Sequence, residues 1–92
     1  MNGVSRQNVV LVLGELQERP EYLAPIADSA GEAQANEFRR GVQTIERLCL
    51  QNQPREATDD EIRDRLIASR NLCVGPLARF GRFIERARTA LG

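Results

Sequence analysis

The chain has 92 residues, the length of one small domain. Hydrophobic residues make up 41% of it, but three Phe, one Tyr and no Trp leave a core of mainly aliphatic side chains. Thirteen basic residues balance thirteen acidic ones, so no net field draws the protein to nucleic acid or to a membrane surface. All thirteen basic residues are arginine, a usage typical of the GC-rich genomes of some bacteria and their phages. Without Lys or His, the chain has no Schiff-base lysine and no imidazole base, so we predict that it is not an enzyme.

The first predicted helix covers residues 6–19, with Ser5 as its N-cap. The β-branched run in it also permits a strand, but no other segment offers a pairing partner. One face of the predicted helix carries apolar residues at helical spacing: Val9, Val12, Leu13 and Leu16. Pro20 is expected to end this helix or to start a short turn over residues 20–26.

The second predicted helix begins at a capping box formed by Ser29 and Glu32 and runs to about residue 52, before Pro54. Its apolar face consists of Ala35, Phe38, Val42, Ile45 and Cys49. Gly41 flanks this face, where it either lets a neighbouring helix approach closely or is a surface glycine that weakens the helix.

The third predicted helix starts at Thr58 as N-cap, with Glu61 as its capping-box partner. Acid-to-base pairs four residues apart are predicted between Asp59 and Arg63 and between Glu61 and Arg65. Ile62, Leu66 and Cys73 line its apolar face. Gly75 ends it, and Pro76 suits the first position of a last helix.

The last predicted helix has one apolar face and one basic side. The apolar face consists of Leu77, Phe80, Ile84, Ala87 and Leu91, with Phe83 at its edge. On another side, Arg79, Arg82 and Arg86 gather within about 60° of each other. Glu85 can pair with Arg82 or Arg88.

Four helices joined by short turns predict an all-α fold, a small four-helix bundle that forms a single domain over residues 1–92. Net charge alternates along the chain in blocks that suit attractive antiparallel neighbours. Apolar residues outside the predicted core faces favour self-association, and we expect a homodimer. The candidate residues for that contact are Val10, Leu11, Ile67 and Val74.

The basic side of the last helix is the strongest candidate for partner binding, because arginine and aromatic residues are enriched in interface hot spots. The candidate contact residues are Arg79, Arg82, Phe83 and Arg86, with Arg39 and Arg40 as a second basic cluster. They predict a regulator or adaptor that binds a protein and modulates or inhibits a bacterial or phage complex. Two alternatives are a nucleic-acid-binding module that uses the last helix, and a phage structural or assembly component. A helix-turn-helix across Gly75 is disfavoured, because Asn71 and Gly81 occupy positions that usually hold a small and an apolar residue.

Two cysteines without histidine cannot build a four-ligand zinc site, and we predict neither a metal nor another cofactor. Cys49 and Cys73 are expected to be free, buried thiols, and a disulfide between them is the alternative. The longest apolar run, Val9–Leu13, is too short for a membrane span or for the apolar core of a signal peptide. We therefore expect a cytoplasmic protein that does not bind membranes.

Overall fold

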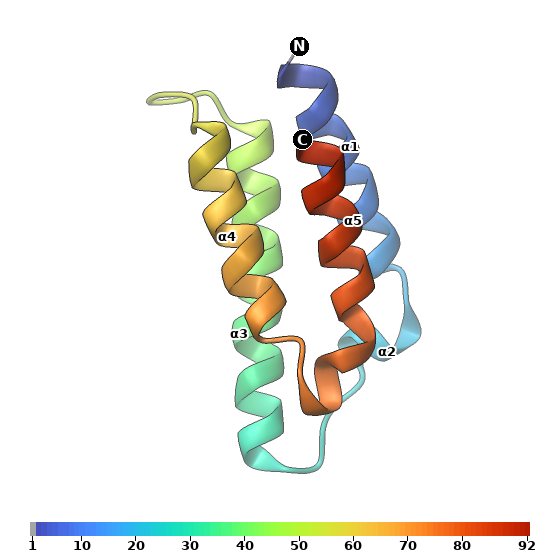
Figure 1. Ribbon diagram of the computed structural model, residues 1–92. Helices are drawn as coiled ribbons and strands as arrows, with labels where there is room; N and C mark the ends of the chain where they lie inside the picture. The colour runs from blue at the N-terminus through green and yellow to red at the C-terminus, as the bar shows by residue number, and fades with distance from the viewer. Residues whose placement is uncertain (1) are drawn as a thin grey trace.

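The computed structural model describes residues 2–92, and Figure 1 shows that they fold into helices joined by short connections. No strand occurs in this part of the chain, so the predicted all-α class is confirmed. The elements are α1 (Asn2–Gln17), α2 (Pro20–Leu23), α3 (Ser29–Leu50), α4 (Asp59–Asn71), the 3₁₀ helix η1 (Gly75–Phe80) and α5 (Gly81–Leu91). None of these helices combines the length and the hydrophobicity that crossing a bilayer requires.

The four long helices lie side by side, and each runs antiparallel to its neighbours (Figure 1). Helices α1 and α4 each pack against both α3 and α5, so α1 and α4 are diagonally opposite. Helix α1 begins and α5 ends at the same end of a molecule that measures 42 × 23 × 20 Å. This arrangement is the one expected for a bundle whose helices are joined by short turns.

The core consists of the apolar faces that helical spacing predicted. The buried residues are Val9, Val12, Leu13 and Leu16 of α1, Ala35, Phe38, Val42 and Ile45 of α3, Ile62 and Leu66 of α4, and Leu77, Phe80, Ile84, Ala87 and Leu91 of η1 and α5. Cys73 is buried as well, whereas Cys49 is only half-buried. Burial of these stripes is the main stabilising contribution, because transfer of apolar surface from water favours folding.

Three aromatic rings close the end of the bundle where α2 lies. Phe38 and Phe80 stack with their centroids 5.8 Å apart, and Tyr22 meets both rings edge-on at 6.3 and 6.1 Å. Tyr22 belongs to the one-turn helix α2, so this contact attaches the connection between α1 and α3 to the core. Arg39 holds the same connection from outside, since its guanidinium donates hydrogen bonds to the carbonyl oxygens of Tyr22 and Ala24.

The helix starts differ from the predictions at two of the three caps. Helix α1 already begins at Asn2, so Ser5 is not its N-cap. The N-cap of α3 is Asp28 and not Ser29, because the Asp28 carboxylate accepts the N–H of Gly31 at 2.9 Å. The predicted cap of α4 is confirmed, since Thr58 Oγ1 accepts the N–H of Glu61 at 3.1 Å.

The segment after α4 turns at Gly75, whose φ of 57° lies in the left-handed region that glycine adopts without strain. The predicted last helix does not begin as an α-helix at Pro76. Its first turns are the 3₁₀ helix η1, and α-helical geometry begins at Gly81.

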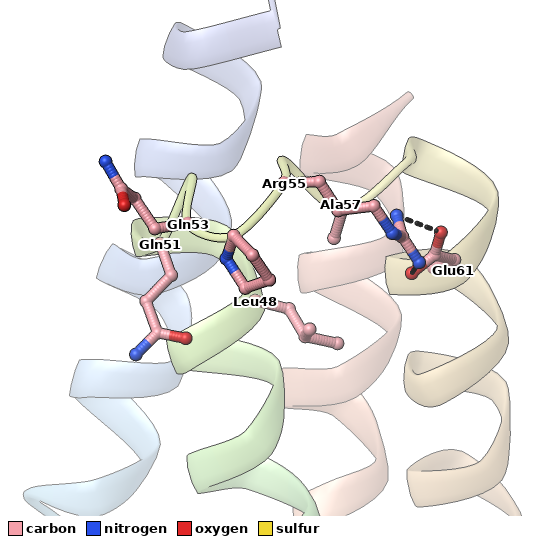
Figure 2. Close-up of a pocket in the computed structure, with 7 residues that line it drawn as sticks. Leu48, Gln51, Gln53, Arg55, Ala57 and Glu61 are labelled. Carbon is pink, nitrogen blue, oxygen red and sulfur yellow. Dashed lines mark hydrogen bonds and ion pairs between the residues drawn. The ribbon is translucent and has the colours of Figure 1, made fainter.

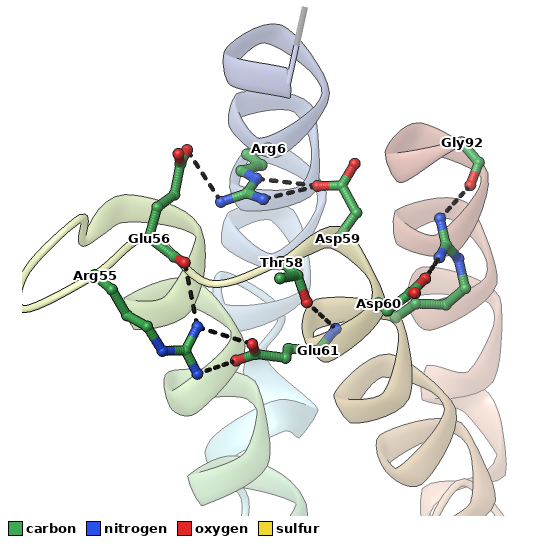
Figure 3. A network of polar contacts seen from close by, with 9 residues as sticks. Arg6, Arg55, Glu56, Thr58, Asp59, Asp60, Glu61 and Gly92 are labelled. Carbon is green, nitrogen blue, oxygen red and sulfur yellow. Dashed lines mark hydrogen bonds and ion pairs between the residues drawn. The ribbon is translucent and has the colours of Figure 1, made fainter.

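The acidic start of α4 is bound by arginines from other parts of the chain (Figure 3). Arg6 of α1, whose side chain is only 6% exposed, reaches Asp59 at 2.8 Å and Glu56 at 3.3 Å. Arg55 of the preceding loop pairs with Glu61 at 2.9 Å. The predicted pairs Asp59–Arg63 and Glu61–Arg65 are therefore wrong, because tertiary partners replace the neighbours four residues on.

Arg63 pairs with Asp60 at 2.7 Å, three residues earlier in the chain. Its guanidinium also donates to the carbonyl oxygen of Gly92 at 3.0 Å (Figure 3). The three consecutive acids of α4 thus engage three different arginines.

Gly41 lies where α3 packs closely against α4. A Cβ atom at this position would lie 3.0 Å from Oγ of Ser69, which is itself buried. Of the two roles considered for Gly41, close approach of a neighbouring helix is the one observed.

We predict that Arg6→Ala lowers the free energy of unfolding by about 2 kcal/mol, because it leaves Asp59 without its buried partner. Urea unfolding followed by circular dichroism measures this change. The matched control is Arg65→Ala, an exposed residue of α4 without an ion pair within residues 2–92, for which a change below about 0.5 kcal/mol is expected. Equal effects of the two substitutions would show that the Arg6 ion pairs do not stabilise the fold.

We also predict different effects of alanine at two helical glycines. Gly14→Ala should stabilise the protein by about 0.5–1 kcal/mol, because nothing lies within 4 Å of the added Cβ and alanine favours the helix. Gly41→Ala should bring no such gain, since its Cβ would press on Ser69. In a Ser69→Ala background the gain at position 41 should return, which a double-mutant cycle measures. An equal gain at both positions with Ser69 present would contradict the tight α3–α4 contact.

Candidate functional site

The predicted contact residues Arg79, Arg82 and Arg86 lie where η1 continues into α5. The fold adds Arg19, from the turn between α1 and α2, to the same surface, because α1 packs along α5. We call the surface formed by Arg19, Arg79, Arg82 and Arg86 the arginine face. The sequence offered no signal for Arg19, since only tertiary packing brings the turn at residues 18–19 beside the last helix.

Two adjoining hollows make up the arginine face, with volumes of about 530 and about 540 Å³. Arg19, Arg82 and Phe83 line both of them. The first hollow is completed by Glu15, Glu18, Pro20 and Arg86, and the second by Glu21, Arg79 and Phe80. The arginines of η1 and α5 therefore face carboxylates of α1 and α2 across a shallow depression.

Two ion pairs neutralise part of this charge. Arg86 bonds to Glu15 at 2.9 Å, and Arg19 bonds to Glu21 at 3.1 Å. Hydrogen bonds from the backbone and from the Arg19 guanidinium lower the pKa of the Glu21 carboxyl below its usual range. Within residues 2–92, Arg79 and Arg82 are exposed and form no ion pair, and the same holds for Glu18.

The position of Phe83 at the edge of the apolar face implied a ring that is exposed to solvent, but the ring is buried. The residue is 6% exposed, and the guanidinium carbons of Arg82 and Arg86 lie 5.0 and 5.9 Å from its ring centroid. The predicted place at the edge of the apolar face is consistent with the small exposure that remains, and the two arginines lie over the ring. Its contribution to the surface is a floor that supports Arg82, and the ring cannot stack on a base.

The predicted second cluster, Arg39 and Arg40, does not join the arginine face. Arg39 is half-buried and its guanidinium is used within the fold, on Glu32, Asn36 and the two carbonyls of the α2 segment. Arg40 is exposed on α3. The two residues are neighbours in sequence with different surroundings, so they do not act as one basic cluster.

The four residues predicted for self-association are also separated by the fold. Val10 and Leu11 belong to α1. Ile67 belongs to α4, which is diagonally opposite α1, and Val74 follows α4 in the chain. Leu11, Ile67 and Val74 are 65%, 38% and 58% exposed, whereas Val10 is half-buried. They therefore form two separate apolar pairs and not one patch.

A further hollow of about 290 Å³ lies between the end of α3 and the start of α4 (Figure 2). Leu48 and Ala57 provide its apolar lining, and Arg55 and Glu61 lie at its edge. Those two charges bind each other, so the hollow offers no charge that awaits a ligand. Its volume is also at the lower limit of small-molecule sites, which makes it a weaker candidate than the arginine face.

The acids of this part of the chain do not converge on a common point. Asp59, Asp60 and Glu61 bind three different arginines and point apart (Figure 3). Within residues 2–92, no three Cys, Asp or Glu side chains come together as metal ligands would. The helices on either side of Gly75 run side by side and antiparallel, whereas the helices of a helix-turn-helix cross steeply (Figure 1).

Cys49 and Cys73 are both free thiols, so the alternative of a disulfide is wrong. Burial raises the pKa of each thiol to about 11. The Cys73 thiol also donates a hydrogen bond to the carbonyl oxygen of Ser69.

Comparisons of the chain with protein-family models, with curated proteins and with solved structures give no significant match. Conclusions about function therefore depend on the geometry of the arginine face.

We predict that Cys73 reacts with Ellman's reagent only after unfolding, and that Cys49 reacts slowly in the native protein, because it is half-buried. In Cys73→Ser protein, the rate at Cys49 should continue to rise with pH beyond 9, since a thiol with a pKa of about 11 is still mostly protonated there. Cys49→Ser protein isolates Cys73 in the same assay. Rapid reaction of Cys73 at neutral pH without denaturant would contradict its burial.

Proposed function

We propose that the protein is a small non-enzymatic regulator or adaptor that binds another protein through the arginine face. The observation that carries this proposal is the mixture of charges on that face. Exposed Arg82 and Glu18 line one hollow, exposed Arg79 lines the adjoining one with Arg82, and Phe80 and Phe83 form the floor. A protein surface can interleave both signs of charge with apolar groups, and arginine over an aromatic ring is common at interface hot spots.

A nucleic-acid partner fits the same face less well. Glu15, Glu18 and Glu21 line the hollows, so phosphates would approach carboxylates as well as arginines. Phe83 is covered and offers no ring for base stacking, and the chain has no net charge. These features favour protein binding over the nucleic-acid alternative.

A homodimer is a further part of the proposal. The apolar pairs on α1 and α4 lie on opposite sides of the molecule, so a two-fold contact would use one pair and leave the other exposed. The α1 side also carries exposed Val4, which lies two turns from Leu11 on the same side of that helix. Because Leu11 and Glu15 are four residues apart on α1, a dimer through this side would adjoin the first hollow of the arginine face.

Site-specific photo-crosslinking tests the proposed function. A photoreactive residue is placed at Thr89, which is exposed on α5 two turns from Arg82, and as a control at exposed Ala68 of α4. In extract of the organism that encodes the protein, we expect one defined protein to be crosslinked at position 89 and not at position 68. That product should disappear when Arg79 and Arg82 are both replaced by Gln.

Fluorescence anisotropy with random-sequence duplex and single-stranded DNA is the complementary measurement, for which we expect no binding at low salt. Micromolar DNA binding that weakens steeply with salt and is lost in the same double variant would instead favour the nucleic-acid function. A crosslink at Thr89 that is independent of both arginines would contradict the arginine face as the contact surface.

A further inference from the structure

The uncompensated charges of the arginine face have a fixed geometry. Arg79 is in the last turn of η1 and Arg82 is in the first turn of α5, three residues later. Arg82 lines both hollows and Arg79 lines the second, whereas Glu18, in the turn that follows α1, lines the first. After the pairs Arg86–Glu15 and Arg19–Glu21 are formed, Arg82 and Glu18 are without an ion pair in the first hollow, and Arg79 is without one in the second.

Arg82 is also held in place before any partner binds. Its guanidinium lies 5.0 Å from the centroid of the buried Phe83 ring, and Arg86, which shares that ring, is anchored by Glu15. A side chain supported in this way loses less conformational freedom on binding than a free arginine does. The planar guanidinium then presents its remaining N–H groups outward, in the geometry that suits a carboxylate.

We propose that the arginine face binds an acidic helical segment of the partner protein, whose carboxylates are three or four residues apart and contact Arg79 and Arg82. A basic residue on the other edge of that segment would face Glu18. This inference rests on the proposed function and specifies the chemistry of the partner. The spacing follows from helix geometry, since residues three and four apart share one face of a helix and match two arginines three residues apart.

A second copy of this chain is a poorer complement for the face. In a two-fold contact, each face would offer the other only one uncompensated carboxylate, Glu18, for two arginines. Phosphates alone are poorer as well, because Glu18 repels them. An acidic segment that also carries a basic edge satisfies all three charges.

A designed peptide tests the proposal. The probe is a short fluorescein-labelled helical peptide with glutamates at three- and four-residue spacing along one edge and a lysine on the other edge. The control peptide has glutamine at the glutamate positions. We expect the acidic peptide to bind the full chain, with an affinity that falls as salt rises, and the glutamine peptide not to bind.

Variants of the protein show whether the intended charges are used. Arg79→Gln and Arg82→Gln should each weaken binding about threefold, and the double variant about tenfold, while Arg65→Gln on α4 has no effect. Glu18→Gln distinguishes the kinds of partner. This substitution should lower the affinity for the lysine-bearing peptide about twofold, whereas it would raise the affinity for a polyanion such as DNA. Circular dichroism confirms that each variant is folded.

Three results would overturn the inference. In the first, the acidic peptide does not bind, although the crosslink at position 89 requires Arg79 and Arg82. The proposed function would then stand, but the partner would not be an acidic helix. Another is tighter binding of duplex DNA than of the peptide, with Glu18→Gln strengthening it. The third is a wild-type dimer in sedimentation velocity that becomes monomeric in the double variant, which would make a second copy the occupant. If neither the crosslink nor the peptide depends on the two arginines, the proposed function falls as well.

Discussion

The packing of the first long helix against the last one is the contact on which the rest of this structure depends. Helix α1 lies along α5 over much of its length, and the Arg86–Glu15 pair joins residues that are 71 positions apart in the chain. This packing closes the ring of four helices, because α3 and α4 are each already next to their neighbours in sequence. It also creates the arginine face, since Glu15, Glu18 and Arg19 come from α1 and its end, while Arg79, Arg82 and Arg86 come from η1 and α5. The candidate site is thus a product of fold closure.

The connection between α1 and α3 explains how the closed bundle is maintained at the end near the arginine face. Tyr22 meets the stacked rings of Phe38 and Phe80 edge-on, and the Arg39 guanidinium binds backbone carbonyl oxygens of the same segment. The Tyr22 hydroxyl is buried without a hydrogen-bond partner among the described residues, and burial raises its pKa to about 12. The edge-on contacts of the Tyr22 ring with the two other aromatic rings stabilise this end of the bundle. At the other end of the molecule, the buried Arg6 performs a comparable task by binding the start of α4 to α1.

Sequence reasoning predicted the helices and their buried faces well, because helical spacing of apolar residues depends only on local geometry. Leu13, Phe38, Leu66 and Ile84 are all buried where that spacing placed them. The predicted ion pairs failed at Asp59 and Glu61, since Arg6 and Arg55 come from segments that a local pattern does not include. The same limit applies to the site. The arginines of the last helix were identifiable from sequence, but the carboxylates opposite them, the burial of Phe83 and the use of Arg39 inside the fold all require tertiary contacts.

The charge pattern links the fold to the partner that we propose for the arginine face. Residues 67–92 contain five arginines and one acid, the largest basic surplus of any segment, whereas residues 1–37 contain six acids and two arginines. Folding brings these two segments together, and the Arg86–Glu15 pair between them neutralises part of the surplus. Arg79 and Arg82 have no ion pair among residues 2–92. Of the acids that line the hollows, Glu15 and Glu21 are paired with Arg86 and Arg19, and Glu18 pairs with neither arginine. Surface ion pairs add little to stability, so the sequence loses little by leaving these two arginines unpaired, and a partner's carboxylates can take that place. A neutral protein can in this way carry a local electrostatic preference for an acidic segment without a net field that would attract nucleic acid.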